Sequence, residues 1–156
     1  MSKFDHVDDA WIKKALSDYK DKIDDRKPSN LGLSGYTVSK PWGHEQWLEL
    51  NEFYAYKVIH MKKGNQSSLQ LHEKKVEANY VIDGVAEVLL ENDEGELESN
   101  IFEAGTGWVV PVGRKHRVIA KTDYTALEVS TPHLDDVIRF HDDTGRGDGK
   151  IVSEHE

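Results

Sequence analysis

Hydrophobic residues near the N-terminus recur every three to four positions, and this spacing predicts one amphipathic helix over residues 7–26. Asp8 and Asp9 lie at its start, where carboxylates suit the positive end of the helix dipole. Pro28 and the glycines that follow it end the helix and begin a loop. We expect the helix to pack on the main body of the protein or on a second subunit through its apolar positions, which are Val7, Ala10, Trp11, Ala15, Leu16, Tyr19 and Ile23.

From Tyr36 onward the pattern changes to short segments rich in β-branched and aromatic residues, separated by turn signals such as Asp83-Gly84. About ten segments of this kind predict an antiparallel sandwich or barrel, and no long helical periodicity interrupts them. We therefore expect an all-β domain over residues 36–146, preceded by the helix and a linker in residues 1–35. Residues 147–156 are expected to form a polar tail.

The sequence of 156 residues contains 20 lysines and arginines against 29 aspartates and glutamates, which gives a formal net charge of −9. The length favours a single domain, and the charge argues against binding to nucleic acid or to an anionic membrane. No apolar run approaches the ~20 residues that span a bilayer. Residues 1–9 lack the apolar core of a signal peptide, so we expect a cytoplasmic protein.

The chain has no cysteine, which excludes disulfides, thiolate zinc sites and cysteine nucleophiles. Gln70 and His72 are two positions apart on an expected strand and share one face, Glu77 opens the next strand, and His116 follows a later turn. If both hairpins lie on one barrel, these side chains converge as two nitrogens and two oxygens. Such a set suits Zn, Mn, Fe, Co or Ni, whereas a site without Gln70 is closer to the non-haem iron pattern.

The spacing of these residues resembles the two sequence motifs of the cupin superfamily. The first motif is matched by Gly64, Gln70, His72, Glu77 and Gly84, with Gln70 in place of a histidine. The second is matched by Gly105, Pro111, Gly113 and His116, with Ala120 in place of an asparagine. The resemblance implies a cupin jelly-roll, an antiparallel β-barrel. It also implies a divalent metal ion bound by Gln70, His72, Glu77 and His116, while the motif glycines are expected in turns.

A narrower resemblance, over roughly residues 38–146, is to the cupin domain of the type II mannose-6-phosphate isomerases. It rests on the Ser-x-Gln-x-His run that ends at His72, on Pro41-Trp42-Gly43, and on the ending from Asp135 to Arg146. This branch of the cupins uses Gln, His, Glu and His as its metal ligands. Thr144 replaces a tyrosine of the family's ending, and Lys75 replaces an arginine ahead of the motif glutamate.

This resemblance implies a metal-dependent aldose–ketose isomerase for a sugar phosphate such as mannose-6-phosphate or fructose-6-phosphate, with zinc as the first candidate metal. The reaction moves a proton between adjacent carbons through an enediol, which requires a base and a group that stabilises the oxyanion. Glu45 and Lys57 are our candidates for the base. Lys75, Arg139 and Arg146 are candidates for binding the phosphate at the barrel mouth. The alternative for each is a solvated surface charge.

Two other functional classes stay open, namely a non-catalytic sugar-binding cupin and another metal-cupin enzyme such as an Fe(II) dioxygenase. The short chain favours the first, and Gln70 argues against the second because dioxygenases use a histidine-rich ligand set. A single small domain of this kind leaves unprotected strand edges. We therefore also expect a homodimer, paired through an edge strand or a terminal segment.

Overall fold

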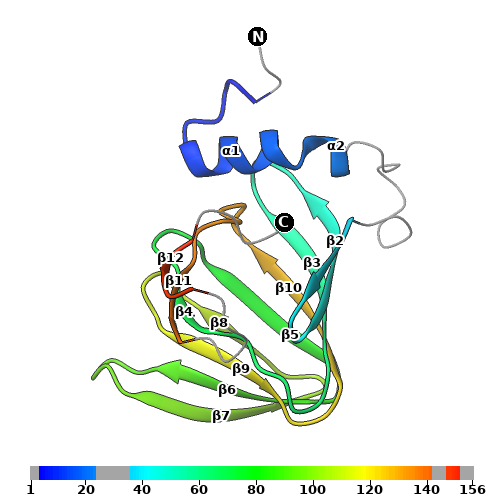
Figure 1. Cartoon of the computed structure of the whole chain (residues 1–156), viewed down its shortest axis with the longest axis vertical. Helices are drawn as coiled ribbons and strands as arrows, with labels where there is room; N and C mark the ends of the chain where they lie inside the picture. Colours follow the sequence, from blue (N-terminus) through cyan, green and yellow to red (C-terminus); the bar gives the residue numbers. More distant parts are fainter. Residues whose placement is uncertain (1–3, 24–35, 142–146, 152–156) are drawn as a thin grey trace.

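The computed structural model describes residues 4–23, 36–141 and 147–151, with a helical segment ahead of the strands (Figure 1). Helix α1 (Ala10–Asp18) begins after Asp9, whose side chain accepts hydrogen bonds from the N–H groups two and three residues later. Helix α2 (Lys20–Ile23) follows. The helix expected over residues 7–26 is thus shorter at its start and interrupted at Tyr19, and residues 24–26 lie outside the described part. The Tyr19 ring packs on the Trp47 ring at 4.9 Å between centroids, so tertiary packing competes with helical periodicity here.

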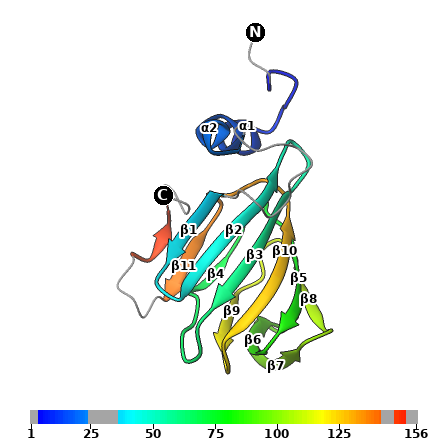
Figure 2. The same cartoon turned by 90° about the vertical axis from the view of Figure 1, so that its right-hand side faces the viewer.

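The described part of the chain forms two six-stranded sheets in which every pair of neighbouring strands is antiparallel. The first sheet has the strand order β1-β2-β3-β10-β5-β8 and faces the viewer in Figure 2. The second has the order β12-β11-β4-β9-β6-β7. The strands are β1 (Tyr36–Lys40), β2 (Gly43–Leu50), β3 (Ala55–Met61), β4 (Leu69–Leu71), β5 (Glu77–Asp83), β6 (Val85–Glu91), β7 (Leu97–Glu103), β8 (Gly107–Val110), β9 (His116–Ala120), β10 (Tyr124–Ser130), β11 (Ile138–His141) and β12 (Gly149–Lys150).

The two sheets lie face to face and enclose the main core (Figure 1). This core joins residues of the first sheet, such as Ile59 and Val81, to residues of the second, such as Val88 and Ala120. The all-β, cupin-like fold with an N-terminal helix is confirmed. The sheets are not closed into a barrel, because among the described residues no strand of one sheet is paired with a strand of the other.

The inner face of the first sheet becomes polar at one end. Along β3 the buried positions are Ala55, Lys57, Ile59 and Met61, and along β10 they are Tyr124, Ala126, Glu128 and Ser130. The strand period of two therefore places a lysine and a glutamate among apolar neighbours inside the sandwich. Lys57 and Glu128 are directly opposite each other in the register of β3 and β10. A buried polar site is thus built into this sheet.

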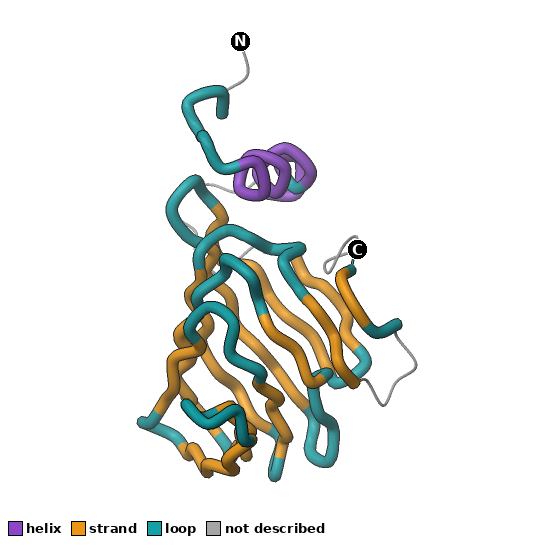
Figure 3. The backbone as a smooth tube through the Cα atoms, turned by 90° about the vertical axis from the view of Figure 1, so that its left-hand side faces the viewer, coloured by secondary structure: helices purple, strands orange, loops and turns teal. Residues whose placement is uncertain are grey.

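The N-terminal helix lies across one end of the two sheets (Figure 3). Ala15, Leu16 and Tyr19 pack into a second core with Trp47 and other residues of the first sheet. Of the two expected roles for the helix, packing on the main body is therefore the one observed. Neither helix of the described residues has the length and apolar composition that crossing a bilayer requires.

Candidate metal centre

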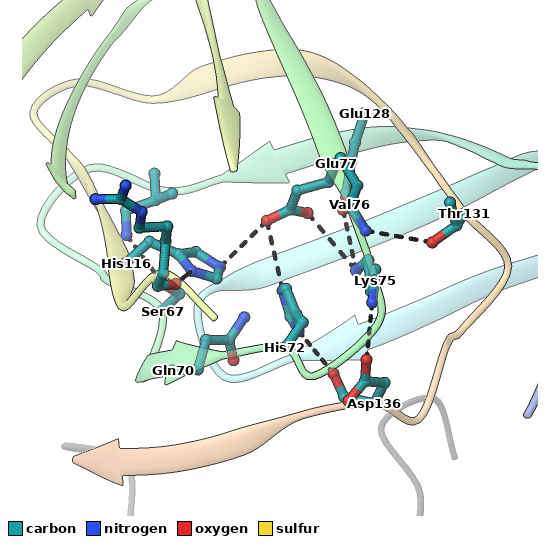
Figure 4. Close-up of polar contacts among 12 residues, drawn as sticks. Ser67, Gln70, His72, Lys75, Val76, Glu77, His116, Glu128, Thr131 and Asp136 are labelled. Atoms are coloured by element: carbon teal, nitrogen blue, oxygen red, sulfur yellow. Dashed lines mark hydrogen bonds and ion pairs between the residues drawn. The ribbon is translucent and has the colours of Figure 1, made fainter. Parts of the chain in front are cut away.

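His72, Glu77 and His116 meet between the two sheets, and their candidate ligand atoms all lie within 4.8 Å of one another (Figure 4). His72 directly follows β4, Glu77 opens β5, and His116 opens β9. All three side chains are buried. The Oε1 atom of Glu77 lies 3.2 Å from Nε2 of His116 and 3.6 Å from Nε2 of His72. Strands from both sheets therefore converge on one carboxylate oxygen and two imidazole nitrogens.

The hydrogen bonds of the two imidazoles fix which nitrogen faces the cluster. Nδ1 of His72 lies 2.6 Å from the backbone oxygen of Asp136, and Nδ1 of His116 lies 3.0 Å from that of Arg114. A carbonyl oxygen only accepts, so both Nδ1 atoms carry a proton, and in the neutral imidazole each Nε2 atom then presents a lone pair. The two Nε2 atoms are buried without a well-formed hydrogen bond. Burial, with the nearby charge of Lys75, lowers the pKa of His72 and keeps it neutral.

These donors fit a bound divalent metal ion. Two ligand atoms at about 2.1 Å from one ion are about 3.0–3.4 Å apart at octahedral or tetrahedral angles, close to the observed separations. Two buried imidazole lone pairs directed at a carboxylate oxygen are otherwise unsatisfied, which is costly in a core. The other oxygen of Glu77, Oε2, faces the ammonium of Lys75 at 3.6 Å. Glu77 therefore presents a single oxygen to the cluster.

Gln70 lies next to the cluster on the inner face of the second sheet, because it is paired with His116 across β4 and β9. It lines the same cavity as Glu77 and His116 (Figure 4). Its Oε1 accepts a hydrogen bond of 2.9 Å from the Ser68 hydroxyl. The position agrees with the expected shared face of Gln70 and the histidines, while a role as fourth ligand stays a prediction.

The sequence predicts that Lys75 lies at the open mouth of the barrel, but the structure places it inside the site. It forms ion pairs of 3.6 Å with Glu77 and 3.3 Å with Glu128. Burial disfavours its charge, but the carboxylates of Glu128 and Glu77 outweigh this effect and raise the pKa of Lys75. The expected mouth position is wrong, because Lys75 lies two residues before the start of β5 and its buried ammonium faces the carboxyl groups of Glu77 and Glu128.

Glu128 is a buried residue of the cavity wall that the sequence motifs did not reveal. Burial and the neighbouring Glu77 together raise the pKa of Glu128 to about 8, against the opposing positive charge of Lys75. Glu128 hydrogen-bonds to Glu77, so the two carboxyl groups hold one proton between them and share the negative charge that faces Lys75. Burial also works against the charge of Glu77, but the positive charge of Lys75 and the hydrogen bond with Glu128 lower the pKa of Glu77 well below its usual range. A carboxylate at an inward position of an otherwise apolar strand was the available signal.

Glu45 and Lys57 form a buried ion pair at another wall of the cavity. Nζ of Lys57 donates to Oε1 of Glu45 at 3.1 Å, and the same oxygen accepts from Nε1 of Trp47 at 3.0 Å. The ammonium also lies 5.1 Å from the centroid of the Trp47 ring. Only 5% of Glu45 and 1% of Lys57 is exposed, so the alternative of a solvated strand face is wrong for both.

The cavity brings these groups together with apolar and neutral polar side chains. Its wall contains the Glu45–Lys57 pair, the Lys75–Glu77–Glu128 group, His116 and Gln70, together with Trp42, Ile59, Met61, Ser67, Ser68, Asn79, Val118, Tyr124 and Val137. Arg139 is buried on β11 and is paired with Gln70 in register, so its side chain shares the inner face of the second sheet. Arg146 lies outside the described residues, so its position relative to the cavity is not described.

Residues 30–142 match the family model described as mannose-6-phosphate isomerase C-terminal. The chain belongs to this family. One curated relative is XanB, a xanthan biosynthesis protein of Xanthomonas campestris pv. campestris. It is 31% identical to this chain over 114 residues, which cover 70% of this chain and 23% of XanB. The mannose-1-phosphate guanylyltransferase of Escherichia coli K12 is 32% identical over 114 residues, with the same coverage. The chain spans about a quarter of the length of these relatives.

Two solved structures from other proteins have a fold similar to that of this chain. Oxalate decarboxylase from Bacillus subtilis at pH 4.6 aligns with a TM-score of 0.63 and 20% identity over 71% of this chain and 31% of its own. KdgF from Halomonas sp. aligns with a TM-score of 0.56 and 18% identity over 65% of this chain and 90% of its own. At this level of identity the likeness concerns the fold alone.

Proposed function

We propose that this chain is a metal-dependent aldose–ketose isomerase that acts on a sugar phosphate such as mannose-6-phosphate or fructose-6-phosphate. One observation carries the proposal. The same cavity has the donors His116 and Glu77 on one wall and the Glu45–Lys57 pair on another. An isomerase needs this combination of an electrophilic centre and a separate acid–base group. Membership in the mannose-6-phosphate isomerase C-terminal family supports the sugar-phosphate substrate.

In this proposal His72, Glu77 and His116 hold the ion, with Gln70 as a fourth ligand. Zinc is the first candidate, and Mn, Fe, Co and Ni suit the same donors. A bound divalent ion supplies Lewis-acid polarisation of a carbonyl or hydroxyl oxygen. The Lys75 ammonium faces the second oxygen of Glu77 at 3.6 Å, so Glu77 would offer its first oxygen to the ion.

Glu45 is the proposed base that takes a proton from one carbon and returns it to the next. The hydrogen bonds from Lys57 and Trp47 both reach Oε1 and hold the Glu45 carboxyl group in place at the cavity wall. Lys57 places a positive charge beside the carbon–oxygen bonds on which negative charge develops in an enediol. The ring of Trp42, also in the cavity wall, offers an apolar face to a sugar.

Arg139 is the proposed phosphate-binding residue among the described ones, because a guanidinium matches the geometry of a phosphate. Arg146 remains a second candidate outside the described residues. The ammonium of Lys75 is already shared between Glu77 and Glu128, so we assign Lys75 to the support of Glu77 rather than to the phosphate.

A non-catalytic sugar-phosphate-binding domain is the second candidate. It is favoured by the coverage of the relatives, since the chain matches 23% of proteins named for mannose-1-phosphate guanylyl transfer. An Fe(II) dioxygenase is the third class, and metal analysis of the purified protein separates it from a zinc isomerase.

The decisive experiment is incubation of the Zn-, Mn- or Co-loaded protein with mannose-6-phosphate or fructose-6-phosphate in D2O. We expect interconversion of the two sugars with deuterium appearing at C1 or C2, because the enediol exchanges its proton with solvent. Glu45→Gln should lose at least about 100-fold in rate while it retains metal, and His116→Ala should lose metal as well. Saturable binding of the sugar phosphate without any exchange would identify the non-catalytic domain instead.

A further inference from the structure

The loop between β4 and β5 carries two of the three donors, with His72 at its start and Glu77 at its end. Its backbone is bound by one buried carboxylate. Oδ1 of Asp136 accepts from the N–H of Glu73 at 3.0 Å, and Oδ2 accepts from the N–H groups of Lys74 and Lys75 at 2.6 Å and 2.8 Å. Three consecutive amides of the loop are thus fixed by a single side chain, and Figure 4 shows the contact with Lys75.

The same residue also orients the first donor. The backbone oxygen of Asp136 accepts the Nδ1 proton of His72 at 2.6 Å, which turns Nε2 toward Glu77. Asp136 is only 1% exposed, so its carboxylate is withdrawn from water and is satisfied by the loop amides. Side chain and backbone of one residue therefore set both the path of the loop and the orientation of an imidazole.

Two further hydrogen bonds hold the ends of the loop, but neither involves the three amides that Asp136 binds. The hydroxyl of Thr131 accepts from the N–H of Val76 at 3.3 Å, and the N–H of Gly113 donates to the oxygen of His72 at 2.8 Å. The segment between β10 and β11 thus supports the loop at the position after Lys75 as well. Only Asp136 contacts three loop amides and a donor ring within this set.

We propose that Asp136 is a positioning residue that preforms the metal centre, so that loss of its side chain weakens metal binding beyond its effect on folding. The inference rests on the proposed metal site. Residues that orient metal ligands from outside the coordination sphere typically change affinity by about 10–100-fold. A loop free to move separates the donors His72 and Glu77, and ordering it again on binding reduces the affinity.

The test compares Asp136→Asn and Asp136→Ala with wild type and with the matched control Asp135→Asn. Asp135 is the neighbouring carboxylate, and its side chain contacts Lys14 at 3.6 Å and the Tyr19 hydroxyl at 3.4 Å in the N-terminal helical segment. Affinity for Zn and Co is measured by chelator competition, the visible spectrum of the Co-loaded protein reports ligand geometry, and the melting temperature of the metal-free protein reports folding.

We expect graded effects. Asp136→Asn retains one oxygen, which can still accept from Lys74 and Lys75, so its affinity should fall about 3–10-fold, whereas Asp136→Ala should lose about 10–100-fold. The Co spectrum should change in Asp136→Ala and not in Asp135→Asn. An Asp136→Ala protein that binds within twofold of wild type overturns the inference. So does failure of both variants to fold in saturating Zn, which assigns the side chain to folding alone.

The proposed metal site is tested independently of the Asp136 inference, by wild type and by the His116→Ala variant. If wild type binds neither metal, or if His116→Ala binds as tightly as wild type, the site itself is wrong whatever Asp136 does. If wild type and Asp135→Asn bind and His116→Ala does not, the site stands and the Asp136 variants alone decide the inference.

Discussion

Lys57 is a charged residue whose ammonium lies in the core, and this makes its partner unusually important. Removing an ammonium and a carboxylate from water costs several kcal/mol for each ion, and the pair persists only because its geometry recovers that loss. Glu45 supplies the opposite charge at 3.1 Å, and the Trp47 ring covers the ammonium on another side. The pair therefore contributes more to the shape of the cavity than to the net stability of the protein.

Lys57→Met should lower the free energy of unfolding by about 3–5 kcal/mol, because Glu45 is left as an uncompensated buried charge. The double variant Lys57→Met/Glu45→Gln should recover most of this loss, since no charge remains to be paired. Urea denaturation of the two single variants and the double variant measures the interaction. Equal losses in Lys57→Met and in the double variant would contradict a buried ionic pair.

The sequence predicted the three donors better than their supporting residues, and the reason is physical. The spacing of His72, Glu77 and His116 in the sequence is set by strand period and turn length, so it can be recognised without knowledge of how the interior packs. Lys75 and Glu128 depend on which neighbour fills the interior, a property of three-dimensional contact. Alternation alone does place Glu128 on the face of Tyr124 and Ala126, so its inward position was accessible from sequence, though its partners were not.

At the scale of elements, the start of helix α1 is tied to the body through one carboxylate. Asp9 caps the helix and also contacts Nε2 of His133 at 3.1 Å and Nζ of Lys74 at 3.3 Å. Burial raises its pKa, but the hydrogen bonds from His133, from the N–H of Ile12 and from Lys74 bring the pKa of Asp9 down from 3.8 to about 2. The folded state thus prefers the ionised carboxylate.

Asp9→Ala should destabilise the protein by about 1 kcal/mol at neutral pH, as expected for the loss of a helix cap. The pKa of Asp9 is lower in the folded state than in the unfolded state, so the stabilisation is complete above pH 4 and is lost as the pH falls toward 2. Denaturation of wild type and variant between pH 7 and pH 3 measures the difference. Asp8→Ala, at an exposed neighbouring position, is the control and should change little.

Two glycines of the first cupin motif share one backbone conformation but have different surroundings. Gly64 has φ +83° and Gly84 has φ +85°, which confirms that both are turn residues. A Cβ atom on Gly64 would meet nothing within 4 Å, whereas one on Gly84 would lie 2.2 Å from the backbone oxygen of Asp123. Sequence spacing cannot tell these two positions apart. Only at Gly84 does the backbone of the turn between β9 and β10 occupy the space that a side chain would need.

Gly64→Ala should therefore cost about 1–2 kcal/mol, the strain of a left-handed residue with a side chain. Gly84→Ala should cost about 3 kcal/mol or more, because the backbone near Asp123 must also move. Chemical denaturation of the pair separates the two contributions, with Gly64→Ala as the internal control. Equal losses would show that the close approach at Gly84 relaxes without penalty.

At the scale of the whole molecule, two sheets enclose a cavity whose polar groups come from both. The hydrophobic pattern along the chain predicted the all-β class and the helix ahead of it. It did not predict that the sheets stay open, since closure depends on pairing between edge strands and not on alternation within each strand. The homodimer expected from those open edges stays a prediction.

Because the donors come from both sheets, metal binding should stabilise the sandwich as a unit. Addition of Zn at 100 times its dissociation constant is expected to raise the free energy of unfolding by about 2.7 kcal/mol. Melting curves in a chelator and after Zn is restored measure the effect. His116→Ala should melt at the same temperature in both conditions, and a Zn-dependent shift in that variant would place the ion elsewhere.

The loop between His72 and Glu77 is held through its amides, and this has a consequence for which sequences the loop tolerates. The side chain of Lys74 is exposed, and its contact with Asp9 is a surface pair that contributes little. A saturation library at position 74 should therefore retain metal with almost every amino acid. Proline is the exception, because it lacks the N–H that binds Asp136 at 2.6 Å. Sorting such a library for Zn-dependent thermal resistance should deplete the proline variant alone. Position 74 therefore requires a backbone N–H but tolerates almost any side chain.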